Sequence, residues 1–512
     1  MDNLKIIIET LSAEDKREFT VFIRRQKKSK NRKDFELFKI LQEKKDYKAK
    51  EVVAKLYPEK PNTVAYHALR KRLIRHLLDF IVLKRMDEDT SSASSVMGMI
   101  SMSQYLLGKG RHKLAWQFLK KGEKQAQESE QFHLLNTIYN LQIEYSVHNP
   151  DEALQLTVVK WEENKRLADE DERATIANSL IQQSLDLVKL TGGNIDFEKI
   201  IREVLEGYGL SEAVSKRPRL FFNLMSIARS AALVKKDYHA FAPFLVSKYE
   251  EFEQQHGFSQ SNLYYKLNLL YMVSHVLYRS KQFDESIQYL DLLLENLSEG
   301  KKAYFEIFYP KYCLLLAANL VFSNQSEKAT EVLEQMREGN KYKLSDKEEI
   351  EVIINLGFYY FQQEKHEKAA RCLRELNRSD QYYEKKMGRE WVIKKNMSEM
   401  IFYYDFGDYD LAINKLRTTE RNYAEVFAQP NYQNVKPFIQ LIKLLFKDPS
   451  LVSKPNFMEI VDNSLQFLPF EEEDLQAVSF YAWLKSKMTK KGYYETLLAL
   501  TNDNKKEDAK IN

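Results

Sequence analysis

The chain has 512 residues, of which 44% are hydrophobic and 30% are charged. That balance supplies ample apolar material for a core and a well-solvated surface. Glycine and proline number only 15 and 11, which excludes a collagen-like chain and argues against disorder, hairpin-rich β proteins and Gly-rich nucleotide-binding folds. The formal net charge is +4, but residues 1–86 hold 23 Lys and Arg against 12 Asp and Glu, so a basic head precedes a mildly acidic body.

Residues 1–86 are predicted to form a basic module of about five helices. Ser12 with Glu14 and Asp15 is a capping-box-like helix start. Further helices are expected over about residues 35–42, 49–57 and 63–85, the last with Asn62 as its cap. The polar, serine-rich residues 87–95 are predicted to be a linker.

Residues 52–58 (VVAKLYP) followed by 65–73 (AYHALRKRL) carry a second signal in this module. They resemble the helix–turn–helix of winged-helix bacterial regulators, some of which also carry helical repeat domains. The resemblance implies that Arg70, Lys71 and Arg75 contact phosphates or base edges. A winged helix needs a β-hairpin next, whereas residues 78–86 read as helix. This favours the alternative that the helix packs on the following repeats and its cations are simply solvated.

From about residue 96 one pattern recurs: an apolar segment, a short polar turn, and a small residue that opens a second apolar segment. The clearest small residues are 46, 43, 40 and 43 positions apart: Ala240, Ser286, Ala329, Ala369 and Ala412. Ala115 and Ala153 mark earlier copies, and residues 194–197 are expected to hold a missing turn. Twelve positions before a marker another small residue usually appears: Ser103, Ala228, Ser274, Ala317 and Gly357. Small side chains at both places would let two antiparallel helices approach closely.

This arrangement resembles the tetratricopeptide repeat (TPR) family, in which helix pairs stack into a superhelix. The sequence therefore predicts an all-α fold, a TPR-like α-solenoid of antiparallel helix pairs after the small basic helical module. The repeats should cover residues 96–425, with further helical repeats or a cap over 426–501 and a frayed tail over 502–512. Two features depart from the family: the period is about 40–46 instead of 34, and Met400 replaces a small residue.

No motif for catalysis or cofactor binding was found. None of the nine histidines lies three or four positions from another, and no phosphate-binding loop or nucleophile elbow is present. Cys313 and Cys372 lie in apolar segments and are expected to be small buried hydrophobes. The sequence thus predicts no enzyme, no cofactor and no metal, in a cytoplasmic protein that does not cross a membrane.

The resemblance to the TPR family also implies a binding groove along the first helix of each pair. Mapped onto this chain, the groove residues are Asn268, Tyr271, His275, Tyr278, Lys311, Glu351, Phe358, Lys394 and Tyr404. Their rings and polar groups suit an extended peptide or a partner helix, although several aromatics would equally seal neighbouring repeats. The leading hypothesis is a scaffold that binds a protein or peptide. The alternative is a DNA-binding transcriptional regulator whose repeats sense a partner.

Overall fold

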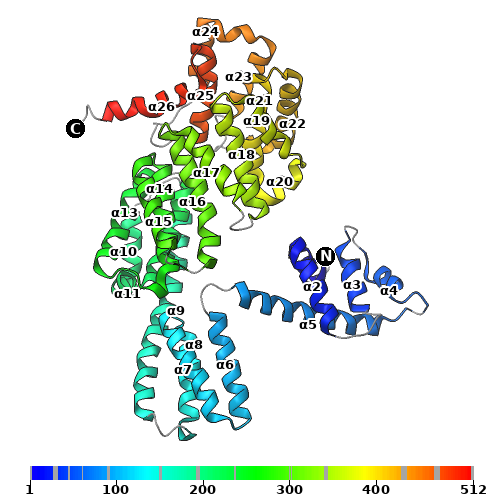
Figure 1. The fold of residues 1–512 in the computed structure, drawn as a ribbon, viewed down its shortest axis with the longest axis vertical. Helices are drawn as coiled ribbons and strands as arrows, with labels where there is room; N and C mark the ends of the chain where they lie inside the picture. The colour runs from blue at the N-terminus through cyan, green and yellow to red at the C-terminus, as the bar shows by residue number, and fades with distance from the viewer. Residues whose placement is uncertain are drawn as a thin grey trace. The chain divides into compact units, whose positions relative to one another are not determined.

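A computed structural model describes residues 3–508 except 27–32, 44–46, 60, 89–92, 149–152, 192–196, 236–237, 299, 301, 340–343, 428–434 and 466–472. The described residues form helices and short connections and contain no strand (Figure 1). The all-α prediction is therefore confirmed. The chain divides into two compact units, Met1–Ala168 and Asp169–Asn512, and the division falls inside a helix. Each unit is described by itself.

The first unit opens with five helices, the number expected: α1 (Asn3–Thr10), α2 (Ala13–Gln26), α3 (Lys33–Gln42), α4 (Ala49–Leu56) and α5 (Thr63–Glu88). Ser12 caps α2, since its hydroxyl accepts from the Asp15 N–H at 3.0 Å while Asp15 accepts from the Ser12 N–H. The apolar side of α5 is buried with Phe19 and Phe38 in one core. Since α5 runs on to Glu88, residues 78–86 form no wing in this structure.

The rest of the first unit comprises α6 (Ala93–Gly108), α7 (His112–Glu128), α8 (Phe132–Glu144), the 3-10 turn η1 (Ser146–His148) and the start of α9 (Leu154–Thr191). Of the expected linker 87–95, residues 87–88 belong to α5 and residues 93–95 to α6, because serine is well tolerated at a helix start. Residues 89–92, and residues 149–152 before the weak marker Ala153, lie outside the described part.

The second unit continues the helical succession. Its first half comprises α10 (Phe197–Gly207), α11 (Ser211–Lys216), α12 (Pro218–Lys235), α13 (Tyr238–Gln255), η2 (Gln260–Asn262), α14 (Leu263–Arg279), α15 (Phe283–Ser298), α16 (Lys302–Phe322) and α17 (Ser326–Glu338). Its second half comprises α18 (Asp346–Gln362), α19 (His366–Glu375), α20 (Asp380–Met387), α21 (Arg389–Asp405), α22 (Tyr409–Phe427), α23 (Val435–Lys447), η4 (Pro449–Ser453), α24 (Pro455–Ser464), α25 (Leu475–Thr489) and α26 (Tyr493–Asp508).

Helix pairs are the repeating unit here, as the small-residue pattern predicted. The pairs α14–α15, α16–α17, α18–α19 and α21–α22 pack along their lengths, and α14, α16 and α18 also pack in succession. The second small residues are completely buried: Ser286, Ala329, Ala369 and Ala412. In the α14–α15 pair the Ser286 hydroxyl donates to the Ser274 carbonyl at 2.7 Å. A Cβ added to Gly357 would lie 3.4 Å from the Cβ of Cys372 on α19. The predicted close approach is confirmed.

The turns inside the pairs share one backbone conformation that the sequence pattern did not reveal. Five residues before a small marker stands a residue with positive φ: Gly110, Lys281, Asn324, Glu364 and Gly407. The next residue then donates its N–H back to the preceding helix, as from Gln282 to the Leu277 carbonyl at 2.9 Å. These are glycine-type helix ends, yet only two of the five residues are glycine. The expected turn at residues 194–197 falls mainly outside the described residues.

The proline-punctuated C-terminal third is helical too. Pro449 begins η4 and Pro455 begins α24, each at a first-turn position that suits proline. Helix α25 (Leu475–Thr489) lies within the segment 426–501 that was expected to be helical. Helix α26 continues to Asp508, through most of the segment 502–512 that was expected to fray. Residues 509–512 lie outside the described part.

Helix α16 is long and apolar enough to span a membrane on length and composition alone. It nevertheless packs against α14, α15, α17 and α18 as an ordinary repeat helix. Its side chains Phe308, Cys313 and Ala317 belong to the core of the second unit. Its apolar character is thus explained by the packing of the repeats.

Candidate functional site: the first-helix surface

The first helices α14, α16, α18 and α21 bound a cavity of about 320 Å³ that α25 completes. We call the side of these four helices that faces this cavity the first-helix surface. Three of the predicted groove residues, Tyr278, Phe358 and Lys394, lie in its wall. The full lining is Tyr278, Arg279, Val321, Phe322, Ile354, Asn355, Phe358, Tyr359, Gln362, Trp391, Lys394, Lys395, Leu475, Gln476 and Ser479.

Three cations line this cavity, but they differ in how strongly they are already paired. Lys395 is buried and lies 2.7 Å from Glu399, so it belongs to an internal ion pair. Arg279 Nη1 lies 3.2 Å from Asp474 Oδ2. Among the described residues Lys394 pairs with Glu390 alone, at 3.3 Å and one helical turn away at the solvent edge, and such exposed pairs are weak. Lys394 is therefore the cation most available to an incoming group.

A buried acceptor in the same wall has no partner among the described residues. Gln362 is 6% exposed, and its Oε1 atom makes no hydrogen bond. Leaving a buried polar atom unpaired costs about 1–3 kcal/mol. The atom has almost no exposed surface, so a buried water molecule could satisfy it but a ligand in the cavity does not reach it.

Four further predicted residues form a second group on the same first helices but outside the lining of the cavity: Tyr271 and His275 on α14, Lys311 on α16 and Glu351 on α18. The Lys311 ammonium lies 5.7 Å from the Tyr271 ring centroid. Burial lowers the pKa of Lys311, although the charge of Glu348 opposes this shift. Burial also lowers the pKa of His275 to about 3. Burial raises the pKa of Glu351. In these three titratable side chains, burial therefore favours the neutral form over the charged form.

Two predicted groove residues have structural partners instead. The Asn268 side chain donates to the Tyr264 carbonyl of its own helix at 2.8 Å. The Tyr404 ring stacks on Phe446 and meets Trp483 edge-on, with centroids 5.2 and 5.8 Å apart. Tyr404 therefore helps to pack the C-terminal helices.

Phe358 contacts both the cavity and the next repeat. It lines the cavity, and it also meets Phe402 of the next first helix with a centroid distance of 5.2 Å. Its neighbour Phe361 is buried against the same Phe402 ring at 4.2 Å. The interpretation that such aromatics seal adjacent repeats thus holds for Phe361 and in part for Phe358.

The contribution of the C-terminal helices to the site was missed by sequence reasoning. Asp474 reaches Arg279, Trp483 Nε1 donates to Asp405 Oδ2 at 3.1 Å, and the Tyr494 hydroxyl donates to the Val321 carbonyl at 2.6 Å. These contacts join α25 and α26 to α14, α16 and α21. No repeat marker or motif in residues 474–494 indicated them, because each partner lies far away in the sequence.

The basic face of α5 is a separate feature, in the first unit. Lys71 and Arg75 are exposed, whereas Arg70 donates to the Tyr66 hydroxyl at 3.2 Å. The same face continues with Leu78 and Val82, which are 58% and 56% exposed. Apolar side chains next to cations are more typical of a protein-binding face than of a purely phosphate-binding one. Nucleic-acid binding by this face stays a prediction.

Neither cysteine is placed for nucleophilic chemistry. Cys313 and Cys372 are both buried and unpaired. Burial raises the pKa of the Cys313 thiol to about 12 and that of Cys372 to about 11. Since the thiolate is the reactive form, both thiols stay inert at neutral pH. Within the described ranges, no group of three His, Cys, Asp or Glu side chains is placed to hold a metal ion.

Comparison with known proteins yields one structural likeness. The sequence matches no known family model and no curated protein. Among solved structures, the crystal structure of the apo form of RapI is similar to 80% of this chain and 98% of its own, with 12% identity and a TM-score of 0.41. A likeness of this degree identifies neither a family nor a function.

Proposed function

We propose that this chain is a non-enzymatic scaffold that binds a protein or peptide on its first-helix surface. The observation that carries the proposal is the wall of the 320 Å³ cavity, which combines rings and hydrogen-bonding groups from four repeat helices. Tyr278, Phe358 and Trp391 offer apolar area, and Lys394 offers a charged contact. Aromatic anchors among polar groups are typical of peptide-recognition sites.

The site is proposed to act in a reducing compartment such as the cytoplasm. Two buried cysteines without a disulfide support this location. The inert thiols described above also support a binding role, because they leave no activated cysteine nucleophile.

The proposal is tested by selecting binders from a phage-displayed library of random dodecapeptides on the full chain. Recovered peptides are then titrated calorimetrically into the wild type, Trp391→Ala and Lys394→Ala. We expect each substitution to weaken binding about tenfold or more, because a buried aromatic anchor or charge contact contributes at least 1.4 kcal/mol.

Lys385→Ala is the matched control, since Lys385 is an exposed lysine on α20 that does not line the cavity. Circular dichroism melting curves establish that every variant folds. Peptides that bind Trp391→Ala and Lys394→Ala as tightly as the wild type would overturn the assignment of this surface.

A further inference from the structure

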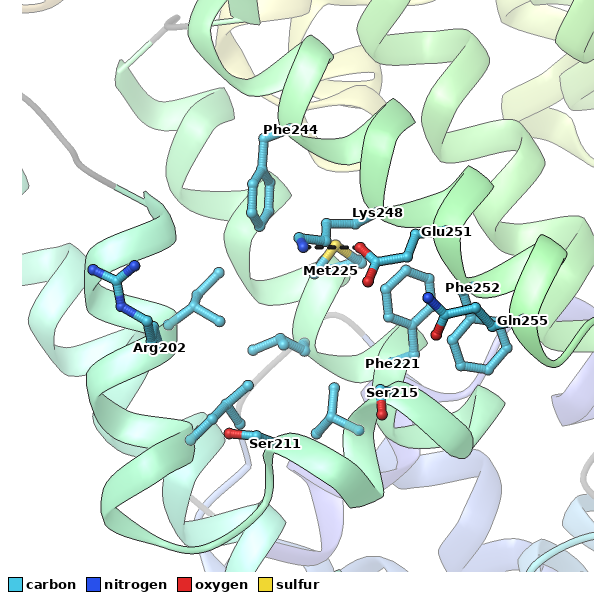
Figure 2. Close-up of a pocket in the computed structure, with 14 residues that line it drawn as sticks. Arg202, Ser211, Ser215, Phe221, Met225, Phe244, Lys248, Glu251, Phe252 and Gln255 are labelled. Atoms are coloured by element: carbon cyan, nitrogen blue, oxygen red, sulfur yellow. Dashed lines mark hydrogen bonds and ion pairs between the residues drawn. The ribbon is translucent and has the colours of Figure 1, made fainter.

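A second cavity, of about 240 Å³, lies within the second unit among α10, α11, α12 and α13 (Figure 2). It shares no lining residue with the cavity on the first-helix surface. Its walls are largely apolar: Ile201 and Leu205 of α10, Val214 of α11, Phe221, Leu224 and Met225 of α12, and Phe244 and Phe252 of α13.

The apolar floor is rigidly packed. Phe221 and Phe252 stack with ring centroids 4.7 Å apart, and Leu224 and Met225 are each 2% exposed. Two small residues of the short helix α11, Ser211 and Ser215, stand in the wall where larger side chains would narrow the opening. The shape of the cavity is consequently set by how α10–α13 pack against one another.

The size of the cavity limits what it can hold. A dry apolar cavity of about 150 Å³ accommodates benzene. A cavity of about 240 Å³ therefore accommodates one ring with a short substituent or a folded alkyl chain of roughly eight carbons. Burying such a chain is favourable because its apolar surface is removed from water.

The rim of the cavity carries a positive imbalance. Figure 2 shows Arg202 on one side and Lys248 with Glu251 on the other. Lys248 Nζ lies 3.0 Å from Glu251 Oε2, so the one acid of the lining is matched by one of its two cations. Arg202 is exposed, and Figure 2 shows its guanidinium turned outward, away from Phe221 and Phe252. Rotation of this exposed side chain toward the opening would let the guanidinium bind a carboxylate with two hydrogen bonds.

We propose that this cavity binds a small amphipathic monocarboxylate, with its alkyl or aryl body over Phe221 and Phe252 and its carboxylate on Arg202. The apolar floor favours a ligand with an alkyl or aryl part, and the net positive charge of the rim favours an anionic ligand over a cationic one. A small molecule fits better than a partner's helix because four helices contribute to the walls. The inference does not rest on the proposed peptide site, since the two cavities are lined by different residues.

Octanoate is the probe, and octan-1-ol is its uncharged counterpart. Both are titrated calorimetrically into the full chain and into three variants. Arg202→Gln should weaken octanoate binding at least tenfold and leave octan-1-ol binding nearly unchanged, because it removes the charged hydrogen bonds only. Ser215→Trp, which places a large ring at an exposed position of the wall, should abolish binding of both.

Lys199→Gln is the control, because Lys199 is an exposed cation of α10 outside the lining; it should change neither affinity. Equal binding of octanoate by the wild type and Ser215→Trp would mean non-specific association and overturn the site. Loss on Ser215→Trp without any effect of Arg202→Gln would overturn the carboxylate assignment. The absence of saturable octanoate binding would overturn the proposal altogether.

Discussion

Gly357 illustrates how one side chain sets the distance between two repeat helices. Its own Cβ is missing, and an added one would come to 3.4 Å from the Cys372 Cβ on α19 and 3.9 Å from the Phe402 ring. The first value is ordinary van der Waals contact for a methyl group. It leaves no room for a larger side chain, because the neighbouring atoms belong to packed helices.

Gly357→Ala should therefore be tolerated, whereas Gly357→Leu should lower the free energy of unfolding by about 1–3 kcal/mol through overpacking. Urea denaturation followed by circular dichroism measures both. Gly207→Leu is the control, since an added Cβ there meets nothing within 4 Å. A similar loss of stability from both leucine variants would contradict the close approach of α18 and α19.

His275 supplies a pH-dependent prediction. Burial, together with Arg229 and Arg279, lowers its pKa from 6.5 to about 3. The folded-state pKa thus lies below the unfolded-state pKa, so the unfolded chain binds more protons between these values. Stability should accordingly fall as the pH drops below about 6.5, by up to about 1.4 kcal/mol per pH unit.

The His275→Gln variant should lose this part of the pH dependence. Urea midpoints measured between pH 7.5 and 5 for both proteins give the comparison, and the difference between the two curves isolates the histidine from other titrating groups. Parallel curves for the two proteins would show that His275 titrates normally in the folded state.

At the scale of elements, the helix pairs could be predicted and their turns could not. Ser274 and Ser286, twelve positions apart, indicated close packing because small side chains and helical spacing are visible in the sequence. The left-handed conformation at Lys281 and Glu364 was hidden, because neither residue type favours it. Packing of the two helices imposes that conformation against the local preference.

Relieving this strain gives a prediction for the turns. Glu364→Gly should raise the free energy of unfolding by up to about 1 kcal/mol, because the left-handed conformation costs a non-glycine residue about 1–2 kcal/mol, while glycine is more flexible when unfolded. Glu367→Gly, in the first turn of α19, should instead destabilise by up to about 1 kcal/mol. Thermal or urea unfolding measures the pair. Destabilisation by Glu364→Gly would contradict the turn geometry at φ 59°.

For the whole molecule, local patterns predicted the repeats but not the contacts between distant segments. The ion pair between Arg279 and Asp474 joins residues 195 positions apart. The hydrogen bond from Trp483 to Asp405 joins residues 78 positions apart. Such contacts depend on how the repeats curve, which small-residue spacing does not specify. For this reason the wall contributed by α25 could not be predicted. The repeat spacing did select Tyr278, Phe358 and Lys394, which line the same cavity, and their role in binding stays a prediction.

Repeat packing also predicts which helices are destabilised by a substitution in the core of one repeat. Leu290 of α15 is fully buried, and Leu290→Ala should cost about 2–5 kcal/mol locally. Since α15 packs against α14 and α16, hydrogen exchange measured by mass spectrometry should rise in α14–α17 and stay unchanged in α6–α8 of the first unit. The reciprocal variant Leu135→Ala, buried in the first unit, should accelerate exchange in α6–α8, which pack together, and leave α14–α17 unchanged. Uniform acceleration through both units in either variant would mean that the chain unfolds as one cooperative body, and nearest-neighbour packing would then not govern its stability.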